Sequence, residues 1–203
     1  MKKVYIHGLG QTESSWDNIV NERDINYCPN LKKLLNDKNA TFDNLYNEFE
    51  KYCNQIEGRL DLCGISLGGM LGLKYAIDNP DKVNSLVLIG TQYKIPKILF
   101  KMQGYVFKVI PKSFFENKGF TKKDFILLIK SMENFDIENK LPLVKSKTLV
   151  ICGQKDKANK KASIELARVI DGAKLVLVED SRHEVNVDGQ KKLYEILNEF
   201  YNN

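Results

Sequence analysis

Short apolar runs alternate with polar segments along the chain, and six of these runs have the length and composition of β-strands. The six predicted strands cover residues 4–6, 25–28, 60–63, 85–89, 148–152 and 175–178. The last three are continuous and rich in valine, isoleucine and leucine, as is typical of parallel strands covered on both faces. The run at 25–28 is weaker and is closed by Pro29.

Apolar residues at helical spacing predict four helices between and after these strands. They lie at about residues 42–56, 70–77, 164–170 and 193–200. Thr41 is expected to cap the first helix and Gly58 to follow its end. The helix at 70–77 is apolar on most sides, so we expect it to be buried. Together the elements predict an α/β fold with a mostly parallel sheet of about six strands and helices on both faces.

One stretch interrupts this alternation. Residues from about 91 to 142 contain no convincing strand and two helical patterns, one around 95–109 and one at 121–132. We interpret the stretch as a helical cap insertion over the edge of the sheet. Its first helix has an apolar stripe surrounded by Lys94, Lys97, Lys101, Lys108 and Lys112. Three interpretations stay open: a helix packed on the core with solvated lysines, a cap lining an apolar acyl site, or a surface touching anionic membranes.

The composition is that of a globular protein. The chain of 203 residues is 43% apolar and 28% charged, which suits one domain, residues 1–203. No run approaches the roughly 20 apolar residues that span a bilayer, and the N-terminus lacks a signal peptide's apolar length, so the sequence favours the cytoplasm. The net charge of +5 is modest, and no basic, aromatic-interleaved stretch indicates a nucleic-acid partner. The oligomeric state is not determined by these features.

The four cysteines, Cys28, Cys53, Cys63 and Cys152, show no close spacing. Three of them lie in or beside apolar strand-like runs, where cysteine usually serves as a small buried hydrophobic residue. With 2 histidines and no clustered cysteines, we expect no metal site and no cofactor.

Ser66 is the first candidate for chemistry. It lies in Gly64-Ile65-Ser66-Leu67-Gly68, between a predicted strand and a predicted helix. A sharp strand-to-helix turn crowds the backbone, and glycines on either side relieve the clash. Such a turn holds a serine hydroxyl at a helix N-terminus, where a developing anion is favoured. The alternative is a tight helix entry without chemistry.

A serine nucleophile needs a base, and the chain offers two histidines. His183 follows the sixth predicted strand, so it should lie at the same end of the sheet as Ser66. We interpret His183 as the base. His7 follows the first predicted strand, and a structural role in ordering that loop is the better interpretation.

A histidine base needs a carboxylate that fixes its tautomer. Asp156 follows the fifth predicted strand and is preferred. Glu179 and Asp180 are nearer His183 in sequence but could serve as loop caps, and adjacent Glu184 should point away from His183.

The order Ser66, Asp156, His183 is the order of the α/β-hydrolase fold. Five segments carry a specific resemblance: "YIHGLGQTESSW" resembles the His-Gly oxyanion loop, "LCGISLGGM" the nucleophile elbow, "LVLIGT" the strand before the cap, "TLVICGQKD" the acid turn and "SRHEVNVD" the histidine loop. The resemblance runs from residue 4 to about residue 188, apart from the cap. It implies that Ser66 is the nucleophile, Asp156 the acid and His183 the base, and that the backbone amides of Leu9 and Leu67 form the oxyanion hole.

Two departures from the family pattern stand out. Members commonly have two strands before the His-Gly strand, whereas the sequence given begins on that strand, so the sheet should be shortened to about six strands. The second strand leads into "YCPNLKKL", with Asn30 where a glycine-rich turn is usual.

The sequence therefore predicts a cofactor-free serine hydrolase that cleaves a small carboxylic ester or thioester through an acyl-enzyme. Within the same class, an acyltransferase, lactonase or perhydrolase would use the same triad with a different second nucleophile or substrate. A non-catalytic binding protein that keeps the fold is the alternative from another class. The expected partner is a small-molecule ester, with no nucleic acid, and membrane contact through the basic cap is not expected.

Overall fold

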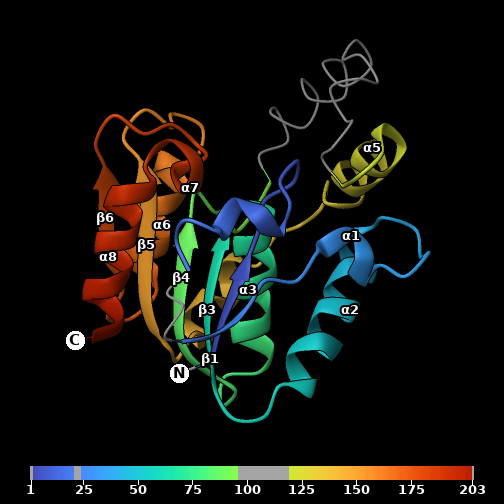
Figure 1. Cartoon of the computed structure of the whole chain (residues 1–203), viewed down its shortest axis with the longest axis horizontal. Coiled ribbons are helices and arrows are strands. Elements are labelled where there is room, and N and C mark those ends of the chain that lie inside the picture. Colours follow the sequence, from blue (N-terminus) through green and yellow to red (C-terminus); the bar gives the residue numbers. More distant parts are fainter. Residues whose placement is uncertain (1, 21–23, 96–118, 203) are drawn as a thin grey trace.

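A computed structural model describes residues 2–20, 24–95 and 119–202 of the chain (Figure 1). The strands are β1 (Lys2–Ile6), β2 (Ile25–Tyr27), β3 (Leu60–Ile65), β4 (Val83–Ile89), β5 (Lys147–Gly153) and β6 (Lys174–Val178). The helices are η1 (Glu13–Trp16), α1 (Leu31–Leu34), α2 (Phe42–Gln55), α3 (Leu67–Asp78), α5 (Lys122–Ser131), η3 (Glu138–Leu143), α6 (Lys160–Val169), α7 (Val185–Asp188) and α8 (Gln190–Asn202). All six predicted strands and the four predicted core helices are therefore confirmed.

The strands form one parallel sheet in the order β2-β1-β3-β4-β5-β6. The chain moves outward from β1 to β2 and then returns to place β3 on the other side of β1. This reversal between β1 and β3 is the point at which open α/β sheets leave a crevice at the carboxyl ends of their strands. The predicted fold class is confirmed by this topology.

Two hydrophobic cores cover the two faces of the sheet. Alternate strand residues such as Val4 and Leu62 pack with α1, α2, α3, α5 and α6, whereas Tyr5 and Cys63 pack with η1, α7 and α8. The strict alternation follows from the two-residue period of a strand. Helices on both faces were expected from the right-handed crossovers, and Figure 1 shows α8 and α2 at opposite sides of the molecule.

Helix α3 is the central helix, and its burial was predicted. Ten of its twelve residues are buried. It begins at Leu67, three residues earlier than its apolar spacing predicts, because Gly68 and Gly69 carry no hydrophobic signal. A Cβ on Gly68 would lie 2.1 Å from the carbonyl oxygen of Ile6, so only glycine lets the helix approach β1 so closely.

Strand β6 forms one edge of the sheet, which its sequence did not indicate. Leu175 packs against one core and Val178 against the other, as expected for a strand covered on both faces, although Leu177 is 37% exposed. A continuous aliphatic run cannot distinguish a central strand from an edge strand, because both pack at least one face.

The stretch from 91 to 142 contains helix but no strand within its described residues. Helix α5 is the predicted second helix of the insertion, and Thr121 forms a capping box with Asp124. The helix is fastened to the core by the N–H of Phe42, which donates to Ser131 Oγ at 2.8 Å, and by the Lys32–Asp124 ion pair at 3.0 Å. The other predicted helix, around 95–109, and its lysines beyond Lys94 lie outside the described residues.

All four cysteines are free, and Cys53, Cys63 and Cys152 are buried while Cys28 is partly buried. Among the helices of residues 2–20, 24–95 and 119–202, none has the length and apolar character to cross a membrane. No group of three or more metal-binding side chains clusters within those same ranges.

Candidate active site

Ser66 sits on a strained turn between β3 and α3. Its backbone has φ 53° and ψ −116°, a conformation that glycine adopts far more readily than serine. The turn is fixed by the Ser66 N–H, which donates to the Ile89 carbonyl at 2.8 Å. A Cβ on Gly64 would lie 2.4 Å from the carbonyl oxygen of Gly68, so the flanking glycines are required by the close backbone approach. The side chain is thereby presented at the N-terminus of α3.

Asp156 and His183 meet at the same end of the sheet. The loops after β5 and β6 bring His183 Nδ1 to 2.7 Å from Asp156 Oδ2. Asp156 is 6% exposed. Burial opposes its ionisation, but hydrogen bonds from His183 and Asn159 outweigh burial and hold the pKa of the carboxyl below its ordinary value. An ionised Asp156 requires a proton on Nδ1, which leaves Nε2 of a neutral His183 free to accept one.

Gly90 makes room for this pair. It follows β4 with φ 52°, and a Cβ there would lie 3.0 Å from His183 Nδ1 and 3.3 Å from Asp156 Oδ2. A larger residue would therefore push the imidazole away from the carboxylate. The segment "LVLIGT" therefore contributes to the site through Gly90, which leaves space for the imidazole beside the carboxylate.

Ser66, Asp156 and His183 line one cavity of about 460 Å³. Its walls are polar at the ends of β3, β5 and β6, and largely apolar on the side of the insertion. The apolar lining comes from Leu9, Leu67, Met70, Ile95, Phe125, Ile129 and Met132. A cavity of this size with a few convergent polar groups is typical of a small-molecule site.

Leu9 and Leu67, the residues expected to donate amides to an oxyanion, both line this cavity. Leu67 is the first residue of α3, so its N–H has no acceptor within the helix. Leu9 lies inside a turn closed by the N–H of Gln11, which donates to the carbonyl of Gly8 at 3.2 Å. Leu9 follows β1 and Leu67 follows β3, so the two residues flank the reversal in strand order.

The other acidic candidates lie apart from His183. Asp180 is 91% exposed at its side chain and pairs with Lys155 at 2.8 Å. Glu184 accepts a hydrogen bond from Gln11 Nε2 at 3.1 Å. The structure thus brings Asp156, and neither of these carboxylates, to the imidazole.

His7 has the structural role that its sequence position suggested. Its Nδ1 donates to the Gly8 carbonyl at 2.9 Å, and its Nε2 accepts from the Leu31 N–H at 3.2 Å. Burial lowers the pKa of His7, which keeps the ring neutral. With both nitrogens bound to backbone, the ring ties the loop after β1 to α1.

Sequence reasoning missed four amide side chains around the site. Gln11 and Asn186 form a buried pair with Nε2···Oδ1 at 3.0 Å and Nδ2···Oε1 at 3.1 Å, which joins the loop after β1 to α7, the helix that follows His183. Asn159 donates to the Asp156 carboxylate, and Gln92 in turn donates to Asn159. In the sequence, only Asn159 gives a hint of its position, because it lies three residues after Asp156. Neither residue type nor spacing marks Gln11, Gln92 or Asn186 as part of the site.

A family model for serine aminopeptidases of the S33 group matches residues 6–148. The chain belongs to this family. The S33 match begins at Ile6, the last residue of β1, includes the Ser66 turn and α3, and ends before Asp156 and His183. It confirms the resemblance to α/β-hydrolases and the assignment to this class of enzyme.

One relative of the S33 chain is a pimeloyl-[acyl-carrier protein] methyl ester esterase from Nitrosomonas europaea, with 26% identity over 91 residues. The match covers 43% of this chain and 36% of the relative, so it spans about a third of that protein's length.

Solved structures resemble the whole S33 fold. An enol-lactonase from Burkholderia xenovorans LB400 has a TM-score of 0.82 at 18% identity and covers 100% of this chain and 91% of that one. A hydrolase from Pseudomonas aeruginosa PA01 has a TM-score of 0.80 at 17% identity, covering 98% and 89%. A carboxylesterase structure from Nitrososphaera gargenis has a TM-score of 0.79 at 17% identity with the same coverage. At this level of identity the likeness establishes the fold.

Proposed function

We propose that this S33 family member is a serine hydrolase that cleaves a small carboxylic ester or thioester through an acyl-enzyme. The observation that supports it most is the Asp156–His183 pair, which shares one cavity with Ser66 on its strained turn. The methyl ester esterase among its relatives points to the same bond type.

In the proposed first half-reaction, Ser66 Oγ attacks the substrate carbonyl carbon while His183 Nε2 takes the hydroxyl proton. The carbonyl oxygen becomes an oxyanion, which the N–H groups of Leu9 and Leu67 stabilise. Collapse of the tetrahedral intermediate breaks the bond to the alcohol or thiol, and the imidazolium gives this leaving group its proton. Asp156 stabilises the imidazolium throughout.

In the second half-reaction, His183 removes a proton from water, and the hydroxide attacks the Ser66 ester. The second tetrahedral intermediate expels Ser66 Oγ, which recovers a proton from His183, and the carboxylic acid leaves. No step uses a metal or cofactor, so a chelator should not inhibit.

The cavity suggests the class of acyl group. Phe125, Ile129 and Met132 from the α5 region form an apolar part of the wall of this cavity. Such a wall favours an apolar acyl chain over a charged one, because a charged group would lose its hydration there. We also propose that residues 1–203 form one domain with a helical cap at about 91–142. A cytoplasmic location is likewise a proposal, which the four free cysteines support.

The test combines a serine-directed fluorophosphonate probe with p-nitrophenyl esters of increasing acyl length. Wild-type protein should be labelled and should turn over the esters, whereas Ser66→Ala should lose labelling and at least about 10³-fold in kcat/KM. Unchanged turnover in Ser66→Ala would remove Ser66 as nucleophile, and a wild-type protein that neither labels nor hydrolyses would favour a binding protein. Preferential turnover of aminoacyl p-nitroanilides would instead indicate a peptidase, and faster release with an added alcohol an acyltransferase.

A further inference from the structure

The loop that carries Asp156 contains an amide whose orientation is unusual for its position. Asn159 is the N-cap residue of α6, yet its side chain makes no capping hydrogen bond to the helix. Its Nδ2 instead lies 2.9 Å from Asp156 Oδ1 and 2.8 Å from Oδ2, so the amide straddles the carboxylate. Its backbone N–H donates to Oδ1 as well, at 3.2 Å.

The second hydrogen-bond donor to Oδ2 is His183. Nδ1 and Asn159 Nδ2 both converge on this oxygen, which leaves the two nitrogens 3.1 Å apart. The carboxylate is thus held by donors from two sides. Rotation of Asp156 would break the bonds from Asn159, so the oxygen that faces His183 has a fixed position.

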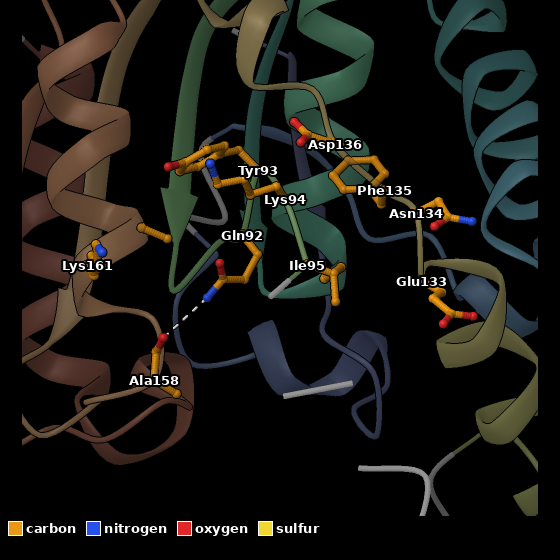
Figure 2. Close-up of a pocket in the computed structure, with 11 residues that line it drawn as sticks. Gln92, Tyr93, Lys94, Ile95, Glu133, Asn134, Phe135, Asp136, Ala158 and Lys161 are labelled. Atoms are coloured by element: carbon orange, nitrogen blue, oxygen red, sulfur yellow. Dashed lines mark hydrogen bonds between the residues drawn. The ribbon is translucent and has the colours of Figure 1, made fainter. Parts of the chain in front are cut away.

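A second amide side chain, that of Gln92, fixes the orientation of Asn159. Gln92 Nε2 donates to Asn159 Oδ1 at 2.8 Å and to the Ala158 carbonyl at 3.3 Å. Figure 2 shows this side chain extending from the segment after β4 toward Ala158. With two carbonyl acceptors, Gln92 must present its NH₂ group, and Asn159 must then present its own NH₂ group to Asp156.

We infer that Gln92 and Asn159 form an amide relay that positions the catalytic acid, and through it His183, for the reaction. The inference rests on the proposed function. Asn159 and Gln92 are positioning residues, because they act on the proton-transferring imidazole through Asp156.

The relay also forms part of the wall between two cavities. Gln92, Ile95 and Ala158 line both the cavity that contains Ser66 and a neighbouring cavity of about 540 Å³, which Figure 2 shows. The first residues after β4 therefore contact the active-site acid through two hydrogen-bonded amides, and a ligand that displaced Gln92 would release Asn159.

The decisive comparison is between Asn159→Ala and Asn159→Asp. If Asn159 acts as a hydrogen-bond donor to Asp156, a carboxylate in its place would repel Asp156. We therefore expect kcat for p-nitrophenyl butyrate to be highest in the wild type, lower in Asn159→Ala and lowest in Asn159→Asp. Asn159→Ala should lose about 10- to 100-fold, as expected for loss of a hydrogen bond to a charged group. If Asn159 served only α6, aspartate would be an equally good N-cap and would keep wild-type kcat, with alanine the worst.

Gln92→Ala should lower kcat by a smaller factor, about threefold, and should add almost nothing in the Asn159→Ala background, because both substitutions break one chain of bonds. The downfield proton resonance of His183 Nδ1–H, assigned by its absence in His183→Ala, should shift in both variants. The matched control is Gln154→Ala, which removes an exposed amide from the same loop and should change neither kcat nor the resonance.

Melting curves test whether each variant folds. If Asn159→Asp fails to fold, the comparison of Asn159→Ala with Gln92→Ala and the double variant remains as the test. Wild-type kcat in Asn159→Asp, or independent losses that multiply in the double variant, would overturn the relay. Unchanged turnover in Ser66→Ala would instead overturn the proposed function, so the two failures are distinguishable.

Discussion

The backbone strain at Ser66 can be measured as a difference between two substitutions. Ser66→Gly and Ser66→Ala both remove the hydroxyl, but only glycine relaxes φ 53° and ψ −116°. A residue held in such a conformation costs about 1–3 kcal/mol. Glycine in turn gives the unfolded chain about 0.4–1 kcal/mol of additional conformational entropy. The difference predicts that Ser66→Gly is more stable than Ser66→Ala by about 1 kcal/mol.

For a chain of this length, such a difference should raise the melting temperature by about 2–4 °C. The assay is thermal or urea unfolding of both variants beside the wild type, with esterase turnover measured on the same samples. Both variants should lack activity, since neither has a nucleophile.

Ser14 provides the control, because it is an exposed serine in η1 with ordinary helical geometry. There the sign should reverse, with Ser14→Gly less stable than Ser14→Ala by about 0.5–1 kcal/mol. If Ser66→Gly is the less stable of its pair, as at Ser14, the argument for a strained nucleophile turn is wrong.

Three further predictions concern the acid, the cavity and the buried histidine. Asp156→Asn should lower kcat/KM by about 10³-fold or more, because asparagine can stabilise the wrong imidazole tautomer. Asp180→Asn should have little effect, and the reverse ranking would move the acid to Asp180. Ile129→Ala should shift the preferred p-nitrophenyl acyl length by several-fold per carbon, since one methylene contributes about 1 kcal/mol in an apolar pocket. Ile126→Ala, on the exposed face of α5, should leave the profile unchanged, and a flat profile in both variants would exclude an acyl site there. Because burial lowers the pKa of His7, the unfolded state takes up the proton first, so melting temperature should fall as pH drops below about 6.5. His7→Gln should show a shallower fall over that range, and an equally steep fall would assign the effect to other groups.

The grouping of Ser66, Asp156 and His183 at one edge of the sheet was predictable from the sequence because of topology. Once the strands are parallel, every residue that follows a strand lies at the carboxyl edge of the sheet. Ser66, Asp156 and His183 each follow a different strand, so their meeting needs only the strand assignments and the strand order. The elbow glycines were equally readable, since a strand-turn-helix with small flanking residues has few alternative geometries.

Other features required the tertiary structure. The sequence preferred Asp156 to Asp180 as the partner of His183, but the 2.7 Å contact itself depends on how the loops after β5 and β6 fold back on each other. The pairing of Gln11 with Asn186 joins residues 175 positions apart, and polar side chains on loops carry no periodic signal.

The sequence by itself determined the alternation of strands and helices, the two-faced sheet and the residues that follow its strands, because hydrophobic burial imposes a period of 2 or 3.6 that the chain displays. The tertiary structure alone decided that β6 is an edge and that Asn159 turns from its helix toward Asp156. The physical reason is that a hydrogen bond depends on distance and direction between particular atoms, and these are fixed only when loops from distant parts of the chain have packed together.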